Sequence, residues 1–457
     1  RGDRGDRSRP SRAQDESFIV SSAMASIAMD TVEEAARKAK EASYRLQGLT
    51  QAVRNEALQE IAAALQDRAD EIVRANEADI DEAERAGLAK ALVKRLRYDR
   101  SKMRESVASL QALVRQEDPI GKVVSRTELD EGLVLERVTC PIGVIGVIFE
   151  SRPDALVQIS SLCLKSGNAV ILKGGSEARR TNEALTKVIV KAVTDLDERF
   201  SSAVQLLSTR EEIDRLLALD QYVDLIIPRG SNQLVRFIKE HTKIPVLGHA
   251  DGICHIYVDE AADLEMAMRV CYDAKVQYPA VCNAMETLLV HEGVAVPFIP
   301  AIANRLRHAG VELRGDEGSR ALAEMKEATE EDWRTEYNDL VLSVRTVPSL
   351  EEAIAHINRY GSHHTDAIIT NDERAARRFM EEVDSSSVMW NCSTRFADGY
   401  RYGLGAEVGI STNKTHARGP VGLEGLTIYK YRLMGSGHVV ADYVGEDARP
   451  FIHRKVL

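Results

Sequence analysis

The sequence has few cysteines, and their spacing excludes a disulfide scaffold. Only six occur in 457 residues, and no two form a CxxC pair. Secreted disulfide frameworks are much denser in cysteine, so this usage favours a reducing, cytoplasmic location. No apolar run reaches the roughly 18–20 residues that a membrane-spanning helix needs. We therefore predict a soluble protein that does not cross a membrane.

Positive charge is also in short supply. The chain carries 60 Lys and Arg against 71 Asp and Glu, a formal net charge of −11. This balance argues against a general nucleic-acid or membrane-surface binder, although a local basic pocket for a small anion stays open. Hydrophobic residues make up 44% and charged residues 29%, which is usual for globular proteins. The length suggests two or three domains.

Common metal and nucleotide motifs are absent. The 11 histidines include the adjacent pair His363-His364, but no HExxH motif or carboxylate cluster accompanies them. We therefore predict no metal site. The sequence also has no GxGxxG fingerprint and no P-loop, so any nucleotide site must be built from less specific turns.

The first 24 residues are predicted to form a disordered tail. They begin with a polar Arg-Gly-Asp repeat and carry Asp15 and Glu16 just before a mildly apolar stretch, which is wrong for a secretory signal. Met24 or Met29 reads as a more natural start.

The remaining chain predicts an α/β protein with two doubly wound domains. Residues up to about 114 are mostly helical in pattern, and the turn 130–132 predicts a β-hairpin within about 122–138. Apolar strands separated by helices argue for parallel sheets. The expected strands are 142–149, 169–172, 204–207 and 224–227, then 253–258, 286–290, 340–344, 367–369 and 387–390. We divide the chain into a nucleotide-binding domain at 25–252, a catalytic domain at 253–424 and a C-terminal segment at 425–457. The last contains a strand at 426–433 that could pair with the hairpin, across a subunit interface for example.

Two turns are candidates for binding a cofactor. Lys173-Gly174-Gly175-Ser176 follows one predicted strand, and Pro228-Arg229-Gly230-Ser231 follows another. Glycines let a ligand approach the backbone, and a helix N-terminus offers free N–H groups to an anion. Each turn alone is also compatible with an ordinary strand-to-helix connection.

Cys282 is the candidate nucleophile. Cys163, Cys254 and Cys271 lie in regular apolar elements and are interpreted as core residues. Cys282 instead follows Tyr278-Pro279-Ala280-Val281 and precedes Asn283, which places it in a loop where a thiol can be partly exposed. Position alone leaves it one candidate among the six cysteines.

The polar stretch 150–154 follows the long apolar strand. Ligands of doubly wound sheets bind at the carboxyl ends of strands, so Glu150, Ser151 and Arg152 are candidates there. An arginine can hold a phosphate or carboxylate through paired hydrogen bonds. A surface loop with solvated charges is the alternative.

Several blocks together resemble the aldehyde dehydrogenase superfamily, and most closely its branch of γ-glutamyl phosphate reductases. The resemblance runs from about Met29 to the C-terminus. Its blocks are Pro141-Ile142-Gly143-Val144-Ile145-Gly146, Phe149-Glu150-Ser151-Arg152-Pro153-Asp154, Lys173-Gly174-Gly175-Ser176-Glu177-Ala178, Cys282-Asn283-Ala284-Met285-Glu286-Thr287, Ser393-Thr394-Arg395-Phe396, Gly403-Leu404-Gly405-Ala406-Glu407 and His416-Ala417-Arg418-Gly419-Pro420. Cys392 stands where alanine is expected.

The resemblance implies a fold, a reaction and roles for residues. It implies two doubly wound α/β domains with a β-hairpin arm for oligomerisation, and NADPH-dependent reduction of L-glutamyl 5-phosphate in the second step of proline biosynthesis. Cys282 would form a thioester, helped by Asn283 and Ser151, and the two turns would hold the cofactor. Glu150, Arg152 and Arg395 would bind substrate. A homo-oligomer and a separate glutamate 5-kinase are the implied protein partners.

One absence favours a reductase over a hydrolytic relative. Hydrolytic members resemble Glu-Leu-Gly-Gly at the domain junction, where the glutamate activates water, but this chain has Gly248-His249-Ala250-Asp251-Gly252. Without a placed base, water attacks a thioester slowly. Asp251 could substitute as the base. A hydrolytic or CoA-acylating dehydrogenase and a non-catalytic binding protein therefore remain alternatives.

Overall fold

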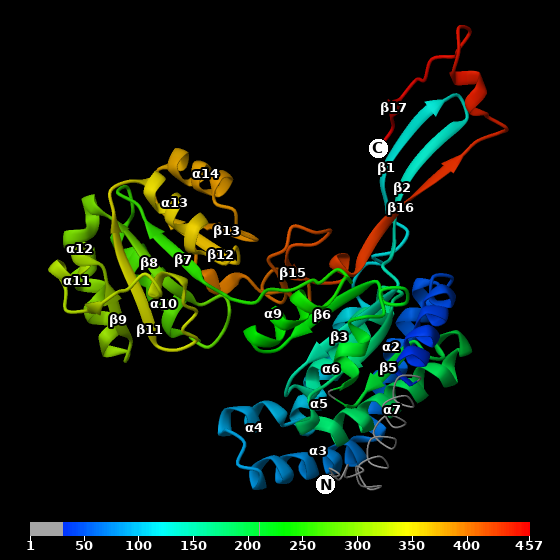
Figure 1. The fold of residues 1–457 in the computed structure, drawn as a ribbon, viewed down its shortest axis with the longest axis horizontal. Coiled ribbons are helices and arrows are strands. Elements are labelled where there is room, and N and C mark those ends of the chain that lie inside the picture. Colours follow the sequence, from blue (N-terminus) through cyan, green and yellow to red (C-terminus); the bar gives the residue numbers. More distant parts are fainter. Residues whose placement is uncertain (1–30, 210) are drawn as a thin grey trace, which may run out of the picture. The chain divides into compact units, whose positions relative to one another are not determined.

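The computed structural model describes residues 31–457 except Arg210, and these form two compact units (Figure 1). The first unit contains the described residues up to Val107 together with Ile142–Ile226 and His241–Pro245. The second contains Ala108–Pro141, Ile227–Glu240 and Val246–Leu457. The predicted tail, residues 1–24, lies outside the described residues. No helix among the residues described is long and apolar enough to span a membrane.

The first unit begins with the predicted helices. Residues 31–46 are helical, and α2 (Gln51–Asp67), α3 (Ala69–Arg85), α4 (Lys90–Leu96) and α5 (Arg100–Val114) follow. Thr50 caps α2 by accepting a hydrogen bond from the Val53 N–H. Both α2 and α3 pack against α7 (Arg179–Leu196), so these helices belong to the first unit rather than forming a separate domain.

That sheet has four strands in the order β5-β4-β3-β6. The strands are β3 (Val144–Phe149), β4 (Ala169–Lys173), β5 (Val204–Leu207) and β6 (Leu225–Arg229). β4 pairs in parallel with both β3 and β5, as the apolar runs predicted. The intervening helices are α6 (Pro153–Lys165), α7 and the short α8 (Glu211–Leu216), with single 3-10 turns η1 (Ser176–Ala178) and η2 (Glu198–Phe200). The helix α9 (Asn232–His241) follows β6, and all of it except His241 belongs to the second unit.

The second unit is built on a seven-stranded sheet in the order β10-β9-β11-β8-β7-β12-β13, and every pair in it is parallel. Its strands are β7 (Cys254–Val258), β8 (Met285–His291), β9 (Glu312–Gly315), β10 (Lys326–Glu327), β11 (Val341–Val347), β12 (Thr365–Ile369) and β13 (Ser387–Trp390). The five strands predicted for this region are all present, with ends that differ by up to three residues. The parallel α/β prediction is therefore confirmed.

Helices cover both faces of this sheet (Figure 1). On β7, Ile256 and Val258 pack with α10 (Leu264–Val276) and α11 (Glu292–His308), whereas Tyr257 packs on the opposite face with α13 (Leu350–Tyr360) and α14 (Glu373–Glu382). Alternate residues of a strand point to opposite faces, so a strand covered on both sides is apolar throughout.

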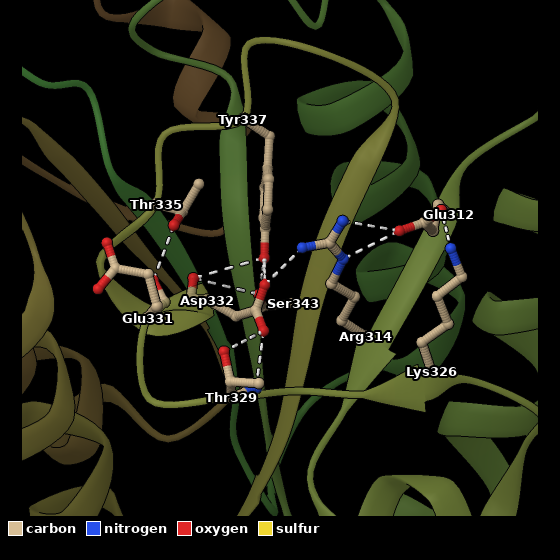
Figure 2. A network of polar contacts seen from close by, with 9 residues as sticks. All are labelled: Glu312, Arg314, Lys326, Thr329, Glu331, Asp332, Thr335, Tyr337 and Ser343. Atoms are coloured by element: carbon tan, nitrogen blue, oxygen red, sulfur yellow. Dashed lines mark hydrogen bonds and ion pairs between the residues drawn. The ribbon is translucent and has the colours of Figure 1, made fainter.

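The edge strand β10 and its neighbour β9 escaped prediction because they are short and polar. A network of polar contacts joins residues at this side of the sheet (Figure 2). Asp332 is its centre: it accepts hydrogen bonds from Arg314, Thr329 and Tyr337 at 2.7–2.9 Å. Burial alone would raise the pKa of Asp332, but the hydrogen bonds from Thr329 and Arg314 outweigh it and lower the pKa to about 2. The short helix α12 (Glu317–Leu322) and the 3-10 turn η3 (Asp332–Arg334) complete this edge.

A four-stranded antiparallel arm forms a further part of the second unit. Its order is β16-β2-β1-β17, from β1 (Val123–Asp130), β2 (Leu133–Pro141), β16 (Thr427–Met434) and β17 (Arg454–Lys455). The predicted hairpin is confirmed as β1 and β2. The C-terminal strand pairs with β2 of the same chain, which corrects the suggestion of pairing across a subunit interface. The remaining short elements are β14 (Gly409–Ser411), β15 (Gly419–Val421), η4 (Thr394–Phe396), η5 (Glu424–Leu426) and η6 (Val440–Tyr443).

Candidate active site

Cys282 lies in the loop between α10 and β8, as predicted. A hydrogen bond of 2.9 Å from the Ala284 N–H to the Val281 carbonyl closes the turn around it. Its side chain is half-buried and carries a free thiol. Cys163, Cys254 and Cys271 are fully buried, so their interpretation as core residues is confirmed. A partly exposed thiol on a fixed turn is suited to nucleophilic chemistry.

The backbone of Cys282 is held from behind by residues at the start of β7. Gly252 approaches so closely that a Cβ on it would lie 2.3 Å from the Cys282 carbonyl oxygen and 2.5 Å from its Cα. The Cys254 thiol donates a hydrogen bond of 3.1 Å to the same oxygen. Burial raises the pKa of Cys254 well above its usual range, which keeps the thiol protonated as a donor. Two residues that sequence reasoning did not select therefore fix the position of the nucleophile.

Asn283 is buried, with 3% of its surface exposed, and its amide Nδ2 donates to the Ala397 carbonyl at 3.0 Å. Its Oδ1 is buried and has no hydrogen-bond partner among the described residues. The side chain thus ties the Cys282 loop to η4, the turn that also carries Arg395. Its predicted catalytic role is untested by this arrangement.

Arg395 lies near Cys282 in the second unit. It is 8% exposed, and its Nε donates to Gln277 Oε1 at 3.0 Å. Burial lowers the pKa of Arg395, with a smaller effect of Arg401 in the same direction, whereas Cys282 acts in the opposite direction. A partly buried guanidinium beside the nucleophile is suited to holding a carboxylate or phosphate of a substrate.

Two histidines also lie beside the nucleophile. The rings of His249 and His364 meet edge to face, with their centroids 4.8 Å apart. His249 Nδ1 bonds the Ile410 carbonyl at 2.8 Å, and His364 Nδ1 lies 2.9 Å from Thr365 Oγ1. Burial lowers the pKa of His249, which favours the neutral ring. Neither histidine was singled out as a site residue from the sequence, since nothing in their spacing connects them to Cys282.

Asp251, the carboxylate that could have served as a hydrolytic base, is engaged elsewhere. Both of its oxygens accept from Arg236 at 2.7 Å, and Oδ1 also accepts from Asn232 at 3.0 Å. Arg236 and Asn232 therefore fix the orientation of this carboxylate, and both of its oxygens already accept hydrogen bonds that a water molecule would have to share. This geometry disfavours the hydrolytic alternative.

Behind the site, Lys275 of α10 and Glu286 of β8 form a fully buried ion pair at 2.5 Å. Burial raises the pKa of Glu286 to about 7 and lowers the pKa of Lys275, while each partner opposes the shift of the other. Both residues flank the Cys282 loop in sequence, so the pair joins its two ends.

The first unit contains the other predicted catalytic residue, Ser151. Its N–H and hydroxyl donate to Glu177 Oε1 at 2.8 and 2.6 Å, so both donors are engaged. Its φ of +43° is uncommon for a residue other than glycine, and such backbone strain clusters at functional sites. The neighbours Glu150 and Arg152 are exposed at the carboxyl end of β3. Their substrate-binding roles stay predictions.

The turn after β4 has features that fit a nicotinamide nucleotide. Lys173 is buried, burial lowers its pKa, and its Nζ donates to the Gly174 carbonyl. A Cβ on Gly174 would lie 2.2 Å from Asn182 Nδ2, and the buried Asn182 Oδ1 lacks a partner within the described chain. A buried ammonium and an unpartnered amide oxygen at a strand end suit the hydroxyl and phosphate groups of a nucleotide.

The predicted cofactor residues divide between the two units. Lys173, Gly174, Gly175 and Ser176 belong to the first, while Pro228, Gly230 and Ser231 belong to the second. Their assembly into one binding site therefore stays a prediction.

Comparison with known proteins decides the family. The model of the aldehyde dehydrogenase family matches residues 13–321, more than half of the chain. The chain belongs to the aldehyde dehydrogenase family. Among its relatives in this family, the γ-glutamyl phosphate reductase of Pelotomaculum thermopropionicum is 57% identical over 423 residues, covering 93% of this chain and 97% of that protein. The γ-glutamyl phosphate reductase of Methanosarcina acetivorans is 56% identical over 429 residues, covering 92% and 96%.

Solved structures agree with this assignment to the aldehyde dehydrogenase family. The crystal structure of γ-glutamyl phosphate reductase from Thermotoga maritima has a TM-score of 0.87 and 40% identity, and the match covers 89% of this chain and 99% of that one. The glyceraldehyde-3-phosphate dehydrogenase of Methanocaldococcus jannaschii, solved with NADP, has a TM-score of 0.61 at 17% identity, over 89% and 95%. At that identity the likeness shows the fold alone. The predicted fold class and the resemblance are both confirmed, and the protein is an oxidoreductase of a family that uses nicotinamide cofactors.

Proposed function

We propose that this protein catalyses the NADPH-dependent reduction of L-glutamyl 5-phosphate to L-glutamate 5-semialdehyde and phosphate, the second step of proline biosynthesis from glutamate. The observation that carries the proposal is the setting of Cys282: a half-buried thiol on a braced turn, with the nearby Asp251 held by Arg236. The names of the relatives, which share more than half of their residues with this chain, support the substrate.

The reaction begins at the Cys282 sulfur. Its thiolate attacks the acyl carbon of the substrate, the bond to the phosphate oxygen breaks, and a thioester forms. Phosphate is a good leaving group, so little acid assistance is needed. NADPH, when held by the residues of the two turns, would supply the hydride that reduces the thioester carbon. Collapse of the resulting hemithioacetal releases the semialdehyde and restores the Cys282 thiolate.

Charge on the substrate oxygen requires hydrogen-bond donors. The backbone N–H of Cys282 is our first candidate, because the contacts at Gly252 and Cys254 fix that peptide. Ser151 is a weaker candidate than the sequence suggested, since Glu177 accepts from both of its donors.

Arg395 is the proposed anchor for the substrate's carboxylate or phosphate. Burial excludes competing water, and Gln277 orients the guanidinium from one side. Glu150 and Arg152 would bind the remaining polar groups of the amino acid. On the cofactor side, Lys173, Gly174, Gly175 and Ser176, with Pro228, Gly230 and Ser231, would hold the nucleotide portion of NADPH.

The arm supports the proposal of a homo-oligomer. The strand β16 lies at the edge of its sheet, and its exposed side chains include Tyr431 at 62% and Leu433 at 57% of their surface. An exposed edge strand with apolar side chains is a template for pairing with a second copy. We also propose a glutamate 5-kinase as the partner that supplies the unstable acyl phosphate. The free thiols are consistent with a cytoplasmic location.

The phosphate requirement tests this function. We expect the purified protein to oxidise L-glutamate 5-semialdehyde with NADP only when inorganic phosphate is present, because the thioester needs phosphate as its acceptor. Sustained, phosphate-independent release of glutamate would establish the hydrolytic alternative, and a requirement for CoA would establish an acylating one.

The nucleophile is tested by substitution in the same assay. Cys282→Ala should abolish turnover while leaving the fold intact. Cys392→Ala is the matched control, since Cys392 is also half-buried in a loop of the second unit but has no role in the proposed reaction. Equal activity of the two variants would refute the assignment of Cys282.

A further inference from the structure

Three side chains from separate parts of the second unit converge on one point. They are His249, before β7, Cys282, before β8, and His364, directly before β12. One ring nitrogen of each histidine and the Cys282 sulfur all lie within 4.8 Å of one another. Two imidazoles and a thiol are the ligand types that zinc and related soft cations prefer.

In each ring Nδ1 has a hydrogen-bond contact, so Nε2 is the candidate ligand atom. A carbonyl oxygen can only accept, so His249 must donate from Nδ1 to Ile410, which leaves a lone pair on Nε2. His364 Nδ1 lies 2.9 Å from Thr365 Oγ1, which can accept or donate, and 3.8 Å from the Cys254 sulfur, whose proton is committed to the Cys282 carbonyl. The tautomer that donates from Nδ1 to these two acceptors leaves a lone pair on His364 Nε2 as well.

A second observation independently points to a ligand. His364 is fully buried, and its Nε2 has no hydrogen-bond partner among the described residues. An unpartnered polar atom at such depth loses its hydration without compensation, which is unfavourable. Coordination by a cation would satisfy it. Orientation of metal-binding histidines by an acceptor on the second nitrogen is the usual arrangement in metal sites.

We propose that His249, Cys282 and His364 form a binding site for a thiophilic divalent cation, with Zn²⁺ as its type, and that occupation of this site blocks the nucleophile reversibly. Tetrahedral zinc, with bonds of about 2.0–2.3 Å, brings its ligand atoms to about 3.3–3.6 Å from one another. The atoms, which lie within 4.8 Å of one another, must therefore close by up to roughly 1.2–1.5 Å, through rotation of the half-buried Cys282 side chain and small shifts of the two rings.

The ligand set is that of an inhibitory site rather than a structural one. Three protein ligands leave a fourth position open, whereas structural zinc sites use four. The nearby Arg395 also opposes a bound cation. The site is therefore expected to bind zinc more weakly than a closed four-ligand site, and the proposed reaction does not need the metal.

Binding can be measured without turnover, so the result does not depend on the proposed function. Protein freed of metal with a chelator is labelled with iodoacetamide, with and without equimolar Zn²⁺, and each cysteine is quantified by peptide mass spectrometry. Zn²⁺ should protect Cys282, while Mg²⁺ should not, and a chelator should restore labelling. The half-buried Cys140 and Cys392 are internal controls that should stay unprotected.

Variants then identify the ligands. His364→Gln and His249→Gln should each weaken protection at least as much as the loss of an outer-shell partner, roughly 10–100-fold in Zn²⁺ affinity. His363→Gln is the matched control, because the adjacent His363 bonds the Asp384 carbonyl instead. In wild type, Co²⁺ should give a thiolate-to-metal charge-transfer band. Absence of that band, no protection of Cys282, or equal protection in all three histidine variants would each overturn the proposal.

Discussion

Gly252→Ala should disable the nucleophile by moving its backbone. The added Cβ would lie 2.3 Å from the Cys282 carbonyl oxygen, 2.5 Å from its Cα and 2.7 Å from its carbonyl carbon. Real Cβ contacts essentially never fall below 3.0 Å, so at least about 0.7 Å of movement is needed, and every crowded atom is backbone. The φ of Gly252 is not in the left-handed region, so this contact, and not backbone strain, is the cause.

The expected loss follows from that displacement. Misplacing a reacting group by about 1 Å costs on the order of 100-fold in rate, so kcat should fall by about that factor. Overpacking should lower the free energy of unfolding by about 1–3 kcal/mol. Both are measurable, as steady-state turnover with semialdehyde, phosphate and NADP, and as urea unfolding.

Gly248→Ala provides the matched control in the same stretch. Its Cβ would meet the Pro228 ring at 3.2 Å, a contact that a shift of a few tenths of an ångström relieves. We expect this variant to stay close to wild type in turnover and stability. If Gly252→Ala behaved like Gly248→Ala, the close approach to Cys282 would have no role in placing the nucleophile.

Three further predictions concern stability and assembly. Lys275→Met leaves the Glu286 carboxyl buried without its cation and should lower the free energy of unfolding by about 3–5 kcal/mol. The double variant that also carries Glu286→Gln should recover most of this stability. Burial raises the pKa of Glu286 to about 7, so at about pH 5 the carboxyl is protonated and carries no charge. The loss of unfolding free energy in Lys275→Met, measured by urea unfolding, should therefore be smaller at about pH 5 than at about pH 8. Asp332→Asn should lower the free energy of unfolding by about 2 kcal/mol at neutral pH, because the hydrogen bonds that hold the pKa of Asp332 at about 2 stabilise the fold only while the carboxylate is ionised. The stability difference between wild type and this variant should become smaller as pH falls from 3.8 towards 2. Leu433→Lys on the exposed β16 edge should shift the protein to smaller species in sedimentation; an unchanged oligomer would exclude this edge as the interface.

The sequence predicted the buried parts of the fold well, because apolar strands and their intervening helices are local patterns. Both β5 and β13 appear at their predicted bounds, β7 differs from its prediction by one residue at its start, and β8 by one residue at each end. The short strands β9 and β10 could not be predicted, since polar contacts around Asp332 stabilise that side of the sheet (Figure 2). Such contacts join residues far apart in sequence and leave no periodic signal.

Some residues of the candidate site could also be predicted from the sequence, and others could not. Cys282 was predictable from a proline-interrupted loop and from the block around it. Gly252 and Cys254 were not, because their roles depend on contact with a backbone about 30 residues away in the chain. His364 was seen only as half of a histidine pair. Its approach to His249 depends on parallel strands aligning their ends at one sheet edge.

The most direct test of the central claim is a single-turnover reaction of the protein with L-glutamate 5-semialdehyde and NADP in the absence of phosphate. The account predicts a burst of NADPH equal to the number of active sites, followed by a stop. Mass spectrometry should then find the glutamyl group on the peptide that contains Cys282, and added phosphate should release it. Continued turnover without phosphate, or an adduct on any other residue, would contradict a reductase that works through a Cys282 thioester.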